Sequence, residues 1–244
     1  MTDEELVQEV CPIINNTGWA FYFLPETQAK GAELGLNGME FYVIGRGGMM
    51  GDCEGSAVAA AFGYFNPAII GKAWDSAKAK IAPRIAGRAH LECSANLGRA
   101  KFAGIPNLAA FVDAADAVNS ATNPDGLSLY AAVKSEPLVT DTAGRAMQLV
   151  TVLREFRGSA HLLAVRAAGL DSKTAHFVKR PNDIKMFGWS DDDAPHIDAT
   201  VRHKMDEAEA LTDRLVAPAY GVLDESGRAD LLAGAQAIKL ALGA

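Results

Sequence analysis

The 244-residue sequence has few of the residues on which several classes of protein depend. Its three cysteines, Cys11, Cys53 and Cys93, are odd in number, far apart and outside any C-x-x-C pattern, so neither a disulfide framework nor a zinc knuckle is indicated. No apolar run approaches the ~20 residues that cross a bilayer, and the acidic residues 1–5 are unlike a secretory signal. These absences predict a cytoplasmic globular protein with no membrane contact.

Basic residues are also in short supply. Lysine and arginine number 23 against 30 acidic residues, which gives a net charge of -7. Affinity for nucleic acid depends largely on lysine and arginine meeting phosphates. A nucleic-acid partner is therefore disfavoured unless a local basic face exists.

Strand signals are nearly absent, because alternating runs of Val, Ile, Thr and aromatic residues do not occur. Segments rich in alanine and leucine, punctuated by glycine and proline, dominate instead, and the sequence predicts an all-α protein. A break near Pro137 is the best boundary between residues 1–137 and 138–244, which we expect to form one compact unit. The expected helices are 26–34, 53–65, 83–102, 106–121, 127–134, 140–168, 173–179 and 224–242.

The segment Gly45-Arg46-Gly47-Gly48 puts flexible backbone beside one fixed charge. Read as a loop, its Gly47 and Gly48 amides and the Arg46 guanidinium predict contact with an anionic ligand. It matches neither the dinucleotide fingerprint nor the Walker pattern. The alternative is a tight crossover between helices.

A second cluster lies in the segment 153–161. On a helix Arg154, Arg157 and His161 stand at i, i+3 and i+7 and share one face, whereas Glu155 would point elsewhere. The face predicts an anion site, since guanidinium groups pair with carboxylate or phosphate and His161 can exchange a proton near neutral pH. The alternative is a structural ion-pair network with Asp141 or Asp213.

Other candidates are weaker. Aromatic residues concentrate in the first third of the chain, where Tyr22 and Phe65 are candidates for a cavity wall. Asn66 is a candidate ligand contact or the cap of a helix that begins at Pro67. Asp192 and His196 lack a complete ligand set, so no metal site is predicted, and no cofactor is indicated.

Several motifs, taken together, resemble an actinobacterial family of helix-turn-helix-like, winged-helix-related proteins. The resemblance covers nearly the whole chain and implies a fold more than an activity: an N-terminal helical half followed by a C-terminal helix-turn-helix or winged-helix-like unit. The motifs are Tyr22-Phe23-Leu24-Pro25-Glu26, Gly45 to Gly51 (G-R-A-A-P-x-G in the family), Phe65-Asn66-Pro67, Leu153 to Gly158 with His161 (L-R-E-H-R-G in the family), Ala168 to Asp171, Gly188-Trp189-Ser190 and Thr212-Asp213-Arg214.

The chain departs from the family pattern where DNA would be read. Where relatives have a glycine-containing wing, residues 196–215 keep a helical composition, so the wing is expected to be missing. A capping box, Ser190 to Asp193, would open the recognition helix with three aspartates, the wrong sign for phosphates. Phe156 also replaces a family histidine.

The sequence thus predicts a helix-turn-helix-derived scaffold that binds a small organic anion with an apolar body and no longer binds DNA. The expected ligand contacts are Arg46, Gly47, Gly48, Asn66, Arg154, Arg157, Tyr22 and Phe65. Were the protein an enzyme, His161 would be the first choice as acid or base and Glu155 the second. The alternative is a ligand-responsive transcription regulator, and a homodimer stays open.

Overall fold

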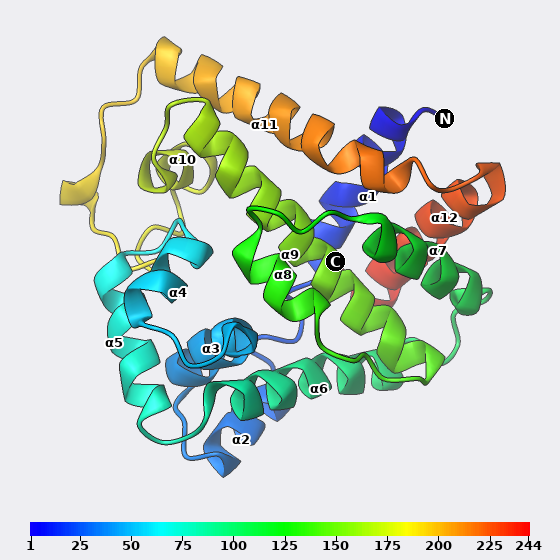
Figure 1. The fold of residues 1–244 in the computed structure, drawn as a ribbon, viewed down its shortest axis with the longest axis horizontal. Coiled ribbons are helices and arrows are strands. Elements are labelled where there is room, and N and C mark those ends of the chain that lie inside the picture. Colours follow the sequence, from blue (N-terminus) through cyan, green and yellow to red (C-terminus); the bar gives the residue numbers. More distant parts are fainter.

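The computed structural model describes all residues from 1 to 244 and consists of α-helices, two short 3-10 helices (η1 and η2) and connecting turns, with no β-strand (Figure 1). The predicted all-α class is confirmed. The elements are α1 (Asp3–Thr17), α2 (Pro25–Glu33), α3 (Gly38–Gly47), η1 (Gly48–Met50), α4 (Gly55–Phe62), α5 (Pro67–Lys78), α6 (Pro83–Lys101), α7 (Leu108–Ala121), α8 (Ser128–Lys134), α9 (Thr142–Ala167), α10 (Ser172–Lys179), η2 (Asp191–Asp193), α11 (Ala199–Tyr220) and α12 (Glu225–Leu242).

Helix α9 runs through the middle of the molecule, and α1, α6, α7, α8, α10 and α11 pack around it (Figure 1). Asp141 caps its start by accepting a hydrogen bond from the Gly144 amide, and Gly169, at a positive φ of 76°, follows its end. Residues 146–153 of this helix are all buried, as expected of a helix at the centre of a core. The polar face predicted for residues 154–161 lies in its second half.

One apolar core joins the two halves of the sequence. It includes Phe21 and Ile44 from the first third together with Met147, Val216 and Ile238 from the last hundred residues. A smaller apolar cluster lies where α9, α10 and α11 meet. No helix is both long enough and apolar enough to span a bilayer.

The glycine-rich segment is not the loop that we predicted. Residues 45–47 are the last turn of α3, and Gly48 begins the 3-10 helix η1. A Cβ atom on Gly48 would lie 2.1 Å from the Pro83 carbonyl oxygen, and one on Gly45 would lie 2.6 Å from the His90 ring. These glycines let α3 and η1 approach α6 closely, so the interhelical alternative describes their role.

The predicted recognition helix is also absent. Ser190 and Asp193 form the expected capping box, but it opens only the three-residue η2. Pro195 explains the stop, because proline forces its predecessor Ala194 out of helical geometry, and Ala194 is extended, with ψ 122°. The next helix, α11, starts at Ala199 under the cap of Asp198.

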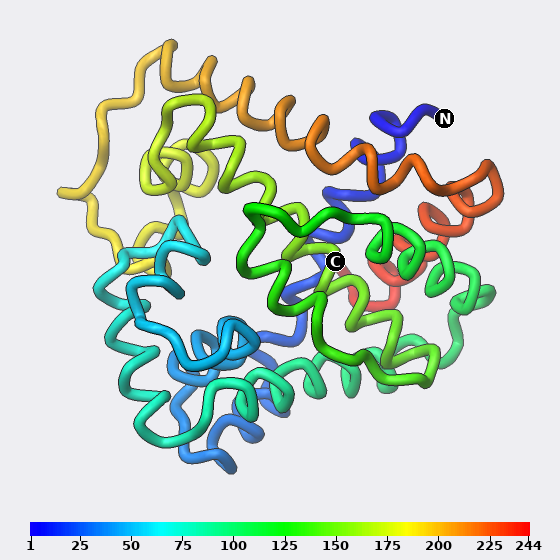
Figure 2. The backbone as a smooth tube through the Cα atoms, in the orientation of Figure 1, coloured from blue at the N-terminus to red at the C-terminus, as the bar shows by residue number.

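Residues 180–198 therefore form a long connection, here called the strap, which leaves α10, passes beside α4 and α5 and returns to α11 (Figure 2). It is pinned to the turn between α4 and α5. The Asn66 amide donates to the Phe187 carbonyl at 2.9 Å, and the Trp189 indole N–H donates to the Tyr64 carbonyl at 2.7 Å. These two hydrogen bonds hold the strap against the α4–α5 side of the molecule.

Candidate functional site

A cavity of about 380 Å³ lies between α1, α3, α4, α8, α9, α10, α11 and the strap. It brings Arg46 of the first third and Arg154, Arg157 and His161 of α9 to a common wall, as the anion-site hypothesis requires. Five basic side chains and two acidic ones line it, against the negative balance of the whole chain. The charged lining residues are Arg46, Arg154, Arg157, Lys179, Arg180, Glu155 and Glu209.

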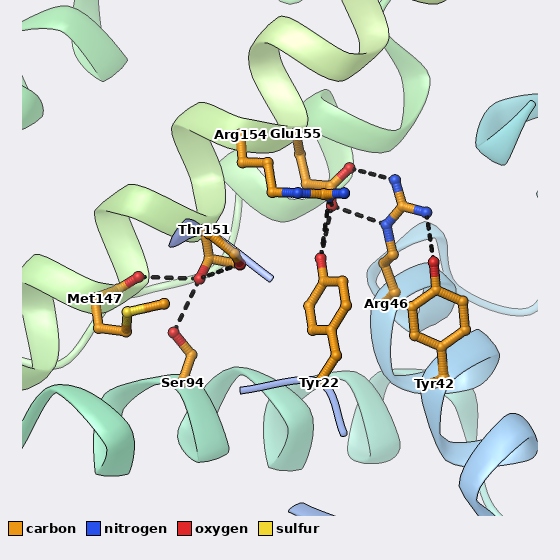
Figure 3. A network of polar contacts seen from close by, with 9 residues as sticks. Tyr22, Tyr42, Arg46, Ser94, Met147, Thr151, Arg154 and Glu155 are labelled. Carbon is orange, nitrogen blue, oxygen red and sulfur yellow. Dashed lines mark hydrogen bonds and ion pairs between the residues drawn. The ribbon is translucent and has the colours of Figure 1, made fainter. Parts of the chain in front are cut away.

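Glu155 is the anchor of the inner wall. Arg46 donates to it from both Nε and Nη2, at 2.8 Å each, and Arg154 Nη1 donates to the same carboxylate at 3.0 Å (Figure 3). The Tyr22 hydroxyl adds a fourth hydrogen bond, at 3.1 Å. Glu155, which we expected to point away from this face, thus holds two arginines and leaves one positive charge uncompensated.

The Glu155 carboxyl stays ionised over a wide pH range. Its burial by itself would raise the pKa, but the charges and hydrogen bonds of Arg46 and Arg154 outweigh that effect and lower the pKa to about 2. A carboxylate so strongly held suits the positioning of arginines better than proton transfer near neutral pH.

Arg157 belongs to a second cluster, which α9 shares with α10 and α11. Its Nη2 lies 3.1 Å from Glu209 Oε2 and 3.6 Å from Asp213 Oδ1. Lys179 Nζ lies 2.8 Å from the other oxygen of the same carboxylate, Glu209 Oε1. The structural alternative is therefore partly realised, because Asp213 is one of the two partners it named. Asp141, the other, caps α9 and pairs with Arg99.

His161 completes this cluster. Its Nδ1 lies 2.9 Å from the Thr212 hydroxyl, its Nε2 lies 3.7 Å from Glu209 Oε1, and its ring is stacked with that of Tyr64. Burial lowers the pKa of His161 to about 4, because the charge of Glu209, which favours the protonated ring, is opposed by those of Arg157 and Lys179 and does not offset the burial. The imidazole is therefore neutral at physiological pH.

Unpaired polar atoms gather at this cavity. Six buried side-chain nitrogen or oxygen atoms in the molecule have no hydrogen-bond partner, and five of them belong to residues of the cavity wall. Buried polar groups are satisfied in most native structures, so such a concentration indicates a place for polar atoms of a ligand or solvent. The five atoms are Tyr64 Oη, Arg154 Nε, Arg157 Nε, Ser159 Oγ and His176 Nε2.

The remaining predicted ligand contacts divide between the wall and the packing around it. Phe65 lines the cavity, whereas Tyr22 lies behind the wall, where its hydroxyl donates to Glu155 and its ring packs against Arg154 and Tyr42. Gly47 and Gly48 do not line it, because both are packed against neighbouring helices. Asn66 caps α5 by accepting from the Ala68 amide and donates to the Gly188 carbonyl, so its cap role holds and it lies outside the wall.

Sequence reasoning missed the wall residues Lys179, Arg180, Phe187 and Glu209, and it placed Tyr42, Phe62 and Tyr64 only within the aromatic group of the first third without singling them out. One signal was available for Tyr64, because it follows a glycine and precedes Phe65-Asn66-Pro67. Its φ of 58° is rare for a bulky residue, and such backbone strain concentrates at functional sites. No group of three or more His, Cys, Asp or Glu side chains is placed to hold a metal ion.

Comparison with known proteins gives one match. The model of a helix-turn-helix family matches residues 8–244. No curated protein and no solved structure matches the chain. Because the family model covers nearly every residue, the chain belongs to this helix-turn-helix family.

Proposed function

We propose that this protein binds a small organic anion with an apolar body in the cavity between α3, α4, α9, α10 and the strap, either as a binding protein or as a cofactor-independent enzyme. The excess of positive charge attracts an anion, and the aromatic side chains accommodate an apolar body. Guanidinium groups with free N–H donors suit a carboxylate or a phosphate.

One observation supports the proposal above the others: the Nε atoms of Arg154 and Arg157 are both buried and unpaired on adjacent turns of α9. A wholly structural ion-pair network would use these donors, since a buried unpaired donor on a charged group costs free energy. Gly158 directly follows Arg157 and lies one turn after Arg154, and a Cβ atom on it would meet nothing within 4 Å. A ligand can therefore approach the α9 backbone here.

We further propose that the scaffold has lost DNA binding. The segment expected to supply a recognition helix is the strap, with three consecutive aspartates in η2. Phosphates would meet like charge there. The net charge of -7 argues in the same direction.

A ligand-responsive regulator is the second candidate. It draws support from the position of the cavity, whose wall combines α3 and α4 with α10, α11 and the strap of the C-terminal half. A ligand would touch both halves, as a regulatory ligand must do to bias one against the other. A mobility-shift assay with random duplex DNA over a range of salt separates the candidates: a shift that weakens steeply with salt favours the regulator, and its absence at micromolar protein favours the binding protein.

The anion proposal is tested with 2-naphthoate, a flat aromatic carboxylate, by isothermal titration calorimetry on the intact protein. We expect Arg157→Gln to weaken binding by roughly 10- to 100-fold, the worth of a hydrogen bond to a charged group.

Arg145→Gln is the matched control. Arg145 also lies on α9 and also loses an ion pair, with Asp116, but it is outside the cavity wall. We expect its affinity for 2-naphthoate to be unchanged. An equal loss in both variants, or no binding of 2-naphthoate by the unmodified protein at millimolar concentration, would overturn the proposal.

A further inference from the structure

Two hydrogen-bond acceptors face each other at the His161 end of the cavity. The first is Glu209 Oε1, which already accepts from Lys179 at 2.8 Å. The second is His161 Nε2, 3.7 Å away. The identity of His161 Nε2 as an acceptor follows from the hydrogen bonds on the other side of the ring.

The Thr212 hydroxyl fixes the tautomer of His161. Its single hydrogen is directed at the Ala208 carbonyl, 2.7 Å away within the same helix. The contact of 2.9 Å between Thr212 Oγ1 and His161 Nδ1 therefore needs a hydrogen on Nδ1. In the neutral ring this leaves Nε2 with a lone pair.

The adjacent stretch of α9 carries hydrogen-bond donors that lack an acceptor. Arg154 Nε and Arg157 Nε are donors without an acceptor. The wall thus holds two donors without an acceptor, on Arg154 and Arg157, and one acceptor without a donor, His161 Nε2. A simple anion satisfies only the donors.

We infer that the ligand is an organic acid that also carries a hydroxyl group, in the simplest case a phenolic carboxylate, with its acid on Arg154 and Arg157 and its hydroxyl donating to His161 Nε2. The inference rests on the proposed anion site and narrows the ligand class. Tyr64, whose ring is stacked with His161 and whose own hydroxyl is unpaired, borders the same position.

The charged groups around His161 are consistent with this assignment. Arg157 on α9 and Lys179 on α10 oppose a positive charge on the imidazole, while Glu209 on α11 favours one. Burial and the two cations prevail and lower the pKa to about 4, so His161 accepts a hydrogen bond at neutral pH. His176 and Arg180, on or beside α10, also line the cavity, and Asp213 on α11 lies 3.6 Å from Arg157 Nη2.

The test compares three probes by calorimetry at neutral pH: 6-hydroxy-2-naphthoate, which carries both groups, 2-naphthoate, which lacks the hydroxyl, and 2-naphthol, which lacks the acid. We expect the hydroxy acid to bind about tenfold more tightly than 2-naphthoate, the difference made by one well-placed hydrogen bond. The naphthol should bind most weakly of the three.

Variants at His161 assign the difference to its side chain. We expect His161→Phe to bind both acids with equal affinity and His161→Gln, whose amide oxygen can accept, to keep part of the preference for the hydroxy acid. Unchanged thermal unfolding of both variants serves as the control for folding.

The outcomes separate the two proposals. If 2-naphthoate binds and the added hydroxyl brings no gain, or if the gain survives in His161→Phe, the hydroxy-acid inference is overturned and the anion site stands. If neither acid binds, both proposals fall.

Discussion

Arg46 on α3 and Glu155 on α9 form a two-point ion pair, with Nε 2.8 Å from Oε1 and Nη2 2.8 Å from Oε2. Both side chains are nearly inaccessible, at 11% and 3% exposure. Because Arg154 shares the same carboxylate, removal of the carboxylate leaves two guanidinium groups without a counterion. This geometry makes Glu155 the most sensitive position of the cavity wall.

We expect Glu155→Gln to lower the free energy of unfolding by about 3–5 kcal/mol, the cost of leaving a buried charge unpaired. Urea unfolding measures the change. Arg46→Met combined with Glu155→Leu replaces the pair by apolar groups and should cost less than the single variant. If Glu155→Gln changed the free energy of unfolding by no more than about 1 kcal/mol, which is typical of exposed ion pairs, the pair would contribute little to stability.

A second prediction concerns Gly158. Alanine is favoured over glycine inside a helix by about 1 kcal/mol, and a Cβ atom at this position meets nothing within 4 Å. We therefore expect Gly158→Ala to raise the free energy of unfolding and, because the new methyl group enters the cavity, to weaken 2-naphthoate binding. Stability and affinity would move in opposite directions.

Gly71→Ala is the control for that prediction. Gly71 lies inside α5, a Cβ atom on it also meets nothing within 4 Å, and it is not part of the cavity wall. It should gain the same stability with no change in affinity. Equal affinities in the two variants would argue against a ligand beside Gly158.

Part of this site could be predicted from the sequence. Helical spacing alone places Arg154, Arg157 and His161 on one face, because their separation is fixed by the pitch of α9. The partnership of Arg46 with Glu155 could not be predicted, since it joins positions 109 residues apart through tertiary packing. Lys179 and Glu209 were missed for the same reason: each is an ordinary surface charge until α10 and α11 pack on α9.

The prediction of a loop at the glycine-rich segment was wrong for a different reason. Glycine permits both a loop and a close helix contact, and sequence alone does not say which of the two a neighbour requires. Here a close contact between helices requires the glycine, because a Cβ atom on Gly48 would lie 2.1 Å from the Pro83 carbonyl oxygen. At the strap, Pro195 carried the information that stops the helix after η2, and the capping box at Ser190 was given too much weight.

A third prediction follows from three buried histidines. Burial lowers the pKa of His90 to about 3 and those of His161 and His176 to about 4, against an ordinary value of 6.5. As the pH falls below about 6.5, these histidines bind protons in the unfolded chain but not in the folded protein, and the free energy of unfolding decreases. Each histidine contributes up to about 1.4 kcal/mol per pH unit.

Urea unfolding across this pH range measures the effect. The histidines dominate the change while the pH stays above about 5.5, because carboxyl groups with lowered pKa values, such as Glu40 and Glu155, lose their contribution mainly below that pH. His90→Leu should reduce the slope by roughly a third, since it removes one of three groups. A stability that is flat from neutral pH down to that limit would contradict the prediction.

The last prediction concerns the turn that carries Tyr64. Gly63 has φ 58° and ψ -174°, a region open almost only to glycine, and a Cβ atom on it would lie 2.6 Å from Leu162 Cδ1. We expect Gly63→Ala to lower the free energy of unfolding by about 2–4 kcal/mol through backbone strain and the clash with α9. Gly104→Ala, at a glycine without positive φ and with nothing within 4 Å of a Cβ atom, is the control and should change the free energy of unfolding little.

Because Tyr64 lines the cavity and its carbonyl accepts from Trp189 of the strap, Gly63→Ala should also weaken 2-naphthoate binding and change the tryptophan emission. Loss of stability without either change would mean that the strain at this turn serves the fold alone.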